Sequence, residues 1–139
     1  MPSSGPSVST AAQSSSNFAV HTTPAYTLAE HIVEAALDKR ARDVAVIDMR
    51  EVSTIADYFV ICTGQSDLQL KAIKNAIVDH IEEEFGERPW HIEGEEHLQW
   101  IVLDYVDTVV HLFSPEKREF YDLERLWGDA PIEYVSDED

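Results

Sequence analysis

Three residues with metal-binding side chains lie close together in the last third of the sequence. Asp104, Asp107 and His111 fall within eight residues, and carboxylates with an imidazole suit zinc or a harder cation. Their spacing argues against a shared ion, because side chains at these positions of an extended hairpin need not converge. His91 and His97 lie among glutamates in an expected solvated loop. The sequence therefore predicts no metal and no cofactor.

A second candidate is the tripeptide Gly64-Gln65-Ser66, which falls between an apolar run and a helical pattern. Backbone N–H groups at such a place can hold an anion. The tripeptide lacks the further glycine and the lysine of a phosphate-binding loop, so it predicts an ordinary turn and helix cap. Cys62 is the only cysteine, which excludes a disulfide within the monomer and a zinc site built from thiolates. We expect Cys62 to be a small buried hydrophobic residue.

The charge of the chain limits its partners. The 139 residues include 27 Asp and Glu against 10 Lys and Arg, which gives a formal charge of −17. Such a charge excludes direct DNA or RNA binding through a broad basic surface, and it favours basic proteins, cations or a second copy of the chain. No apolar run approaches the roughly 18 to 20 residues of a membrane span. We expect a soluble, cytoplasmic protein without membrane contact.

Composition and hydrophobic periodicity divide the chain into one domain with two tails. Residues 1–26 are expected to be a disordered Ser/Thr-rich tail, 27–130 the folded domain, and 131–139 an acidic C-terminal tail. Within the domain, helical spacing predicts helices over 28–42, 67–86 and 115–127, the first with a Thr27/Glu30 capping box. Apolar runs predict strands over 44–49, 57–63, 90–92, 100–104 and 108–113. The order αββα(β)ββα predicts an α/β fold, a mixed β-sheet with flanking helices.

A hairpin turn at Val106-Asp107 fixes which side chains share a face. One face then carries, for the core, Ile101, Leu103, Tyr105, Thr108, Val110 and Leu112. The other carries Trp100, Val102, Asp104, Val109, His111 and Phe113, with Trp100 opposite Phe113. This second face is either a recognition patch or a core covered by helices. Val106 is a poor turn residue, since tight turns favour Gly or Asn at positive φ.

The last predicted helix also carries aromatic residues. Phe120, Leu123, Leu126 and Trp127 form one helical stripe, which predicts core packing. Tyr121 falls off the centre of that stripe. An aromatic residue with a polar tip at such a position is either an interface anchor or a side chain at the edge of the core.

Several strings, spread over residues 28–130, together resemble the ribosomal silencing factor family, also called the Iojap-like family. They are Ala56-Asp57-Tyr58-Phe59-Val60-Ile61-Cys62-Thr63-Gly64, Ser66, Glu93-Gly94, Trp100-Ile101-Val102-Leu103-Asp104-Tyr105, Asp107, Val109-Val110-His111-Leu112-Phe113, Arg118, Phe120-Tyr121, Leu123-Glu124 and Leu126-Trp127. One departure is Val106, where the family usually has Gly. Ordered motifs over such a length are far more specific than any single one.

The resemblance implies a small mixed α/β domain, often a homodimer, that binds the large ribosomal subunit through its ribosomal protein fourteen. Occupancy there blocks association with the small subunit and represses translation when nutrients are limiting. No catalysis is implied. Trp100 and Tyr121 match the family's anchors, and Asp104, Asp107, His111 and Glu124 match its pattern nearby.

Two alternatives remain open at this point. The family's fold is similar to that of nucleotidyltransferases, so one alternative is an enzyme that binds a nucleotide and magnesium, for which Gly64-Gln65-Ser66 would be an incomplete phosphate loop. The other is an acidic dimeric adaptor for a different basic protein.

Overall fold

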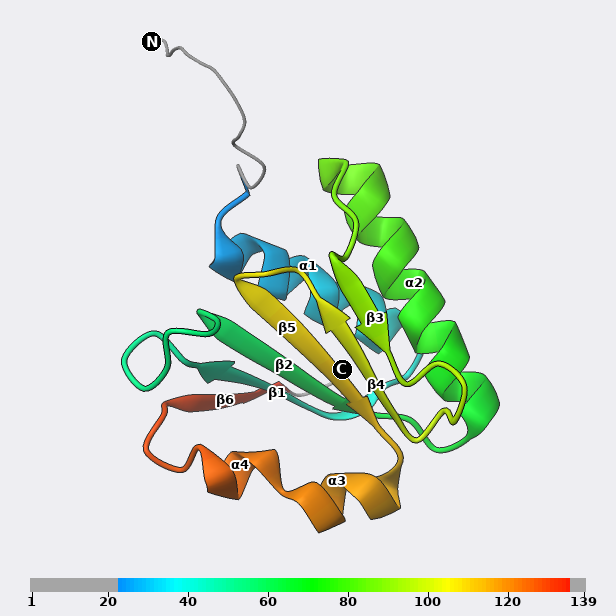
Figure 1. The fold of residues 1–139 in the computed structure, drawn as a ribbon. Coiled ribbons are helices and arrows are strands. Elements are labelled where there is room, and N and C mark those ends of the chain that lie inside the picture. The colour runs from blue at the N-terminus through cyan, green and yellow to red at the C-terminus, as the bar shows by residue number, and fades with distance from the viewer. Residues whose placement is uncertain (1–22, 136–139) are drawn as a thin grey trace, which may run out of the picture.

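A mixed β-sheet forms the centre of the molecule (Figure 1). The computed structural model describes residues 23–135, so the predictions for residues 1–22 and 136–139 lie outside the described part. The helices are α1 (Ala25–Asp38), α2 (Asp67–Phe85), α3 (Pro115–Tyr121) and α4 (Leu123–Leu126). The strands are β1 (Arg42–Asp48), β2 (Tyr58–Thr63), β3 (His91–Glu93), β4 (Trp100–Asp104), β5 (Thr108–Phe113) and β6 (Ile132–Val135). The predicted α/β class is confirmed.

Strand pairing joins segments that are far apart in the sequence. The order across the sheet is β3-β4-β5-β2-β1-β6, and β2 and β5 are parallel whereas the other neighbours are antiparallel. Every residue of β2 and β5 is buried, as expected for central strands covered on both faces. The predicted bounds of β4 and β5 agree with the structure at both ends.

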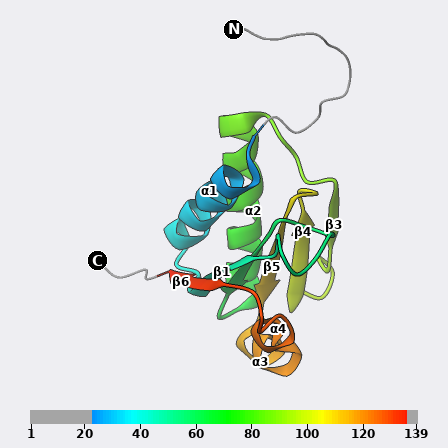
Figure 2. The ribbon, with the colours of Figure 1, turned by 90° about the vertical axis from the view of Figure 1, so that its left-hand side faces the viewer.

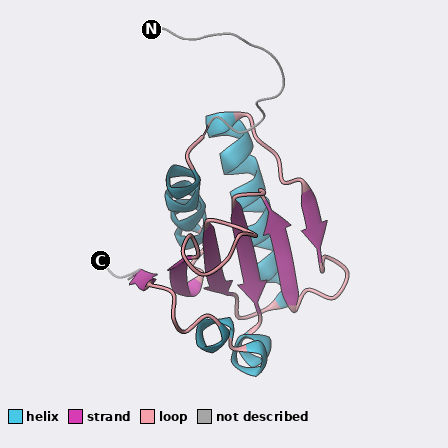
Figure 3. Ribbon diagram, turned by 60° about the vertical axis from the view of Figure 1, so that its left-hand side comes forward, coloured by secondary structure: helices cyan, strands magenta, loops and turns pink. Residues whose placement is uncertain are grey.

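Two apolar clusters cover the two faces of the sheet. One lies between the sheet and the helices α1 and α2, and contains Ile32, Ile77 and Leu103. The other lies beneath the short C-terminal helices and contains Phe59, Phe113 and Leu123. Figures 2 and 3 show α1 and α2 together, well separated from α3 and α4. The sheet therefore has two separate cores, one under α1 and α2 and one under α3 and α4.

The start and end of α2 agree with the signals in the sequence. The Ser66 hydroxyl accepts a hydrogen bond from the Gln69 amide, and Gly86 ends the helix in a left-handed conformation. The predicted capping box of the first helix is wrong, because α1 begins earlier, with Pro24 at its N-cap position and no side-chain cap.

No helix among residues 23–135 combines the length and hydropathy needed to cross a bilayer.

The C-terminal region differs most from the prediction. The helix expected over 115–127 is broken at Asp122, whose φ of 47° places it in the left-handed region. Of the expected apolar stripe, Leu123 is buried and Trp127 packs against the same core cluster, while Phe120 and Leu126 are exposed. Core packing therefore explains only half of the stripe. Residues 132–135, assigned to an acidic tail, form strand β6 against β1.

Candidate protein interface

The register of the β4–β5 hairpin positions the residues proposed to bind a partner. Trp100 pairs with Phe113 and Val102 with His111, which confirms the predicted register. The second face of the hairpin is divided: Val109, His111 and Phe113 are buried, whereas Trp100 and Asp104 are partly exposed. The core interpretation therefore holds for Val109, His111 and Phe113, whereas Trp100 and Asp104 are exposed enough to contact a partner.

The exposed part of this face continues onto α3 as an aromatic patch, which we define as Trp100, Phe120 and Tyr121 together with the buried Phe113 that packs against Trp100. The Trp100 and Tyr121 ring centroids lie 4.5 Å apart, and Trp100 stacks on Phe113 at 5.0 Å. Phe120 meets Tyr121 edge to face at 5.0 Å. Phe120 is 73% exposed and Tyr121 is 42% exposed. The patch therefore offers aromatic surface to a partner while its inner rings are fixed by packing.

His111 orients the indole of Trp100 through a hydrogen bond. The Trp100 Nε1–H donates a hydrogen bond to His111 Nδ1 at 3.1 Å, so the neutral ring carries its proton on Nε2. That Nε2 is buried and has no hydrogen-bond partner among the described residues. Burial lowers the pKa of His111 to about 4. At neutral pH His111 is therefore an uncharged acceptor that positions Trp100.

The carboxylate of Asp104 stabilises the hairpin turn. Its Oδ1 accepts a hydrogen bond from the Val106 amide at 2.7 Å. The Asp107 amide donates to the Tyr105 carbonyl across Val106, whose φ is 78°. This is a three-residue γ-turn of the rare, strained kind. The Asp107 side chain is exposed, and it is the acid of this turn that is available to a partner.

Glu124 is paired within the protein. Arg118 contacts both of its carboxylate oxygens, the shortest contact being 2.6 Å, and also donates to the Thr63 hydroxyl at 2.8 Å. The side chains of Arg118 and Glu124 are only 12% and 18% exposed. This ion pair ties α4 and α3 to the end of β2. Glu124 is therefore a paired structural residue rather than a free surface charge.

A shallow groove of about 450 Å³ runs beside Trp100. Its walls are formed by His91, Glu93, Gly94, Trp100, Val102 and Asp104. Gly94 has a φ of 86°, and a Cβ atom there would lie 1.9 Å from the Trp100 carbonyl oxygen. Only glycine fits this position, so the chain can pass close to the backbone of Trp100. The groove adds acidic surface to the aromatic patch.

The residues considered for catalysis are engaged in structural contacts. Ser66 caps α2, and the Gln65 amide donates to the Gln69 side chain. Cys62 is buried, as predicted, and burial raises its pKa to about 12. Asp104 accepts a hydrogen bond from the Val106 amide, and His111 accepts one from the Trp100 indole. These residues therefore do not form the paired carboxylates and phosphate-binding loop that a nucleotide-binding enzyme would need.

Two features of the surface were not predicted. The exposure of Phe120 follows from the break at Asp122, and aspartate is one of the few residues that tolerate a left-handed conformation. A cluster of His31, Glu34 and His80 joins α1 to α2. His31 and Glu34 are three residues apart on a helix, and this spacing alone indicates that their side chains are neighbours. Nothing local in the sequence points to His80, which is 49 residues away.

Known proteins share this sequence and this fold. Residues 22–139 match the family model described as "Ribosomal silencing factor during starvation". "Ribosomal silencing factor RsfS" of Bacillus subtilis is 45% identical over 95 residues, which are 68% of this chain and 80% of that protein. "Mitochondrial assembly of ribosomal large subunit protein 1" of Mus musculus is 35% identical over 98 residues, 69% of this chain and 43% of that protein.

A solved structure agrees with the sequence matches. A crystal structure from Bacillus halodurans aligns with a TM-score of 0.69 and 34% identity, covering 79% of this chain and 99% of that one. The bacterial relative carries the name of a regulatory factor rather than an enzyme. The resemblance inferred from the motifs of residues 28–130 is thereby confirmed. The chain belongs to the ribosomal silencing factor family.

Proposed function

We propose that the chain binds the large ribosomal subunit through its ribosomal protein fourteen and blocks association with the small subunit. The block is steric, so it needs no catalytic turnover, and it represses translation when nutrients are limiting. The aromatic patch carries this proposal. Trp100 and Tyr121 are the anchors, and Asp107 and the acidic wall of the groove face basic groups of the partner.

Three observations support the proposal. The rings of Trp100 and Tyr121 are in contact, and Phe120 extends them as exposed apolar surface. Aromatic anchors of this kind dominate binding energy in protein interfaces. The charge of −17 suits a basic ribosomal protein and disfavours contact with ribosomal RNA. The mouse relative is named for assembly of the ribosomal large subunit.

The decisive experiment measures binding of Tyr121→Ala to purified large subunits by cosedimentation. Loss of an aromatic anchor costs about 2 kcal/mol, which corresponds to roughly 30-fold weaker binding. Tyr134→Ala is the matched control, because Tyr134 is even more exposed, 64% against 42%, but lies on β6. Trp100→Ala should weaken binding at least as much.

Equal affinities of Tyr121→Ala and Tyr134→Ala would remove the aromatic patch from the interface. Measurable nucleotide turnover with magnesium would instead support the enzyme alternative. Absence of any retention on ribosomal particles, at low salt as well as high salt, would support an adaptor for another protein.

In a subunit-joining assay, light scattering should show that the wild type, but not Tyr121→Ala at the same concentration, prevents formation of the joined particle.

The proposal includes a homodimer, as the family resemblance implies. An acidic chain must join its twin through surface that carries little charge. Light scattering of the free protein should give twice the 15.7 kDa of one chain. A molar mass of a single chain at the concentrations used for ribosome binding would contradict this part of the proposal alone.

A further inference from the structure

We propose that His31, Glu34 and His80 bind a divalent transition-metal ion, best matched by Zn²⁺, that bridges α1 and α2. The site is unrelated to the residues considered for metal binding from the sequence, which predicted no metal. It is the one group of three potential ligands that converges within residues 23–135. It also lies on the helix pair, away from the aromatic patch, so it stands independently of the proposed function.

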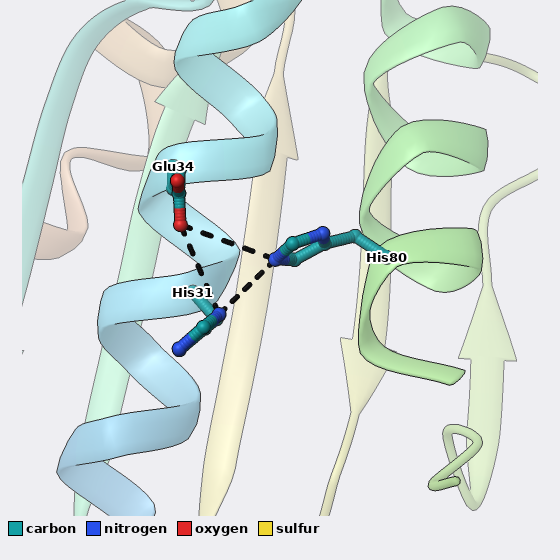
Figure 4. A group of neighbouring side chains, drawn as sticks. All are labelled: His31, Glu34 and His80. Atoms are coloured by element: carbon teal, nitrogen blue, oxygen red, sulfur yellow. Dashed lines mark hydrogen bonds and ion pairs between the residues drawn. The ribbon is translucent and has the colours of Figure 1, made fainter. Parts of the chain in front are cut away.

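The three side chains meet from two helices (Figure 4). His31 and Glu34 are three residues apart on α1, and His80 approaches them from α2. His31 Nδ1 lies 3.1 Å from His80 Nε2, and Glu34 Oε1 lies 3.8 Å and 4.0 Å from these two nitrogens. All three potential ligand atoms therefore lie within 4.8 Å of one another between the helices, with the two ring nitrogens facing each other.

These separations fit a zinc ion closely. The point in the plane of the three atoms that is equidistant from them lies about 2.1 Å from each, and Zn–N and Zn–O bonds are roughly 2.0 to 2.2 Å long. Ligands of a tetrahedral ion at that bond length are about 3.4 Å apart, within the range of the three observed separations. A tetrahedral ion lies out of the plane of its three ligands, so Glu34 Oε1 must move roughly half an ångström closer to the two nitrogens to complete the geometry.

The ligand types select the class of metal. Two imidazoles with one carboxylate suit zinc, copper or nickel, whereas magnesium and calcium prefer oxygen ligands throughout. The side chains of His31, His80 and Glu34 are 32%, 27% and 71% exposed. Solvent can therefore deliver the ion and supply a fourth ligand, as in sites with three protein ligands.

The surroundings already restrict one of the ligands. Phe85 meets the His31 ring edge to face at 4.8 Å, which limits rotation of that imidazole. The net charge of −17 raises the local concentration of cations near the whole molecule. A metal-free explanation also exists, in which one neutral imidazole donates a hydrogen bond to the other. That explanation leaves no need for Glu34 and predicts no response to metal.

The binding test uses the full chain without an affinity tag, stripped of metal with a chelator and titrated with ZnCl₂ in a calorimeter. One ion per chain should bind. Loss of a group that only orients a ligand already costs about 10- to 100-fold in metal affinity. His80→Gln, which removes an imidazole ligand, should therefore weaken binding by at least about 100-fold, and Glu34→Gln, which keeps one oxygen, by about 10-fold. His97→Gln is the matched control, because His97 is exposed in the loop before β4 and lies outside the cluster; it should bind as the wild type does.

Absence of saturable zinc binding by the wild type would leave a hydrogen-bonded histidine pair only and overturn the proposal. Wild-type affinity in His80→Gln would place the bound ion elsewhere and overturn it equally. Co²⁺ supplies a second readout that does not depend on stability, because a tetrahedral Co²⁺ complex absorbs strongly in the visible range. The wild type should give this spectrum, and His31→Gln should not.

Thermal unfolding separates loss of the site from loss of the fold. Zinc at 100 times its Kd should raise the Tm of the wild type by about 10 °C, because the ion binds only the folded chain. The metal-free Tm of His80→Gln shows whether this variant folds. A folded His80→Gln whose Tm does not respond to zinc supports the site, whereas an equal rise in Tm for both proteins contradicts it.

Discussion

Trp100 is fixed in place before any partner arrives. Its indole donates to His111, and its ring lies against Phe113 and Tyr121. A side chain held in this way loses little rotamer freedom on binding, so more of its contact energy is available as affinity. Mutations of His111 are expected to weaken binding through the position of Trp100, without touching the partner.

His111 also makes stability sensitive to acid. Its pKa in the folded chain is about 4, against about 6.5 when unfolded, so between these values the unfolded state binds more protons. Its contribution is complete above pH 6.5 and is lost as the pH falls toward 4. Between about pH 7 and pH 5 the wild type should lose about 2 kcal/mol of unfolding free energy beyond the loss in His111→Asn.

Urea unfolding of both proteins at the two pH values measures this difference. Asn is the suitable replacement because its side-chain oxygen can still accept the hydrogen bond from the Trp100 indole while it does not titrate. Carboxylates contribute equally to both proteins and cancel in the comparison. The same acid sensitivity in wild type and variant would show that His111 is not the titrating group.

At the scale of elements, the turn of the β4–β5 hairpin stores strain. Val106 is β-branched and has a φ of 78°, a region that costs such residues about 1–3 kcal/mol. Val106→Gly relieves this strain but adds about 0.5–1 kcal/mol of chain entropy to the unfolded state. We expect a net gain of about 1 kcal/mol in the free energy of unfolding, measured in urea. A loss of stability would mean that the Val106 side chain contributes more by packing than its backbone costs.

The sequence predicted those elements whose signals are local. Alternation along β4 and β5 determined their register, and Ser66 and Gly86 marked the two ends of α2. The break at Asp122 was not predicted, because a continuous helix would also place Leu123 and Trp127 on one stripe. Strand β6 was missed for a similar reason. Its pairing with β1 depends on contacts roughly 90 residues apart, and two of its four residues are exposed.

For the candidate site, the sequence indicated which residues to consider but not which contacts each of them makes. Family motifs pointed to Trp100 and Tyr121, which lie in contact. Asp104 and Glu124 were assigned beside them as acids near the partner, yet one caps a turn and the other pairs with Arg118. Such roles depend on distances between side chains from separate elements. A single sequence without a structure does not supply them.

At the scale of the whole molecule, the large negative charge acts over a longer range than any contact. It should accelerate encounter with a basic partner, and salt should screen this effect. In stopped-flow or surface-binding kinetics with large subunits, the association rate constant should fall at least about 10-fold between roughly 50 mM and 500 mM NaCl, with little change in the dissociation rate. An association rate independent of salt would show that charge does not guide the encounter.

The position of β6 beside β1 has a consequence for biosynthesis. β1 leaves the peptidyl-transferase centre long before β6 is made, yet these two strands are neighbours in the finished sheet. During translation the outer edge of β1 is therefore an open row of amide and carbonyl groups, the kind of edge that invites aggregation. Each newly made molecule passes through this exposed stage until its C-terminal strand emerges and closes the edge.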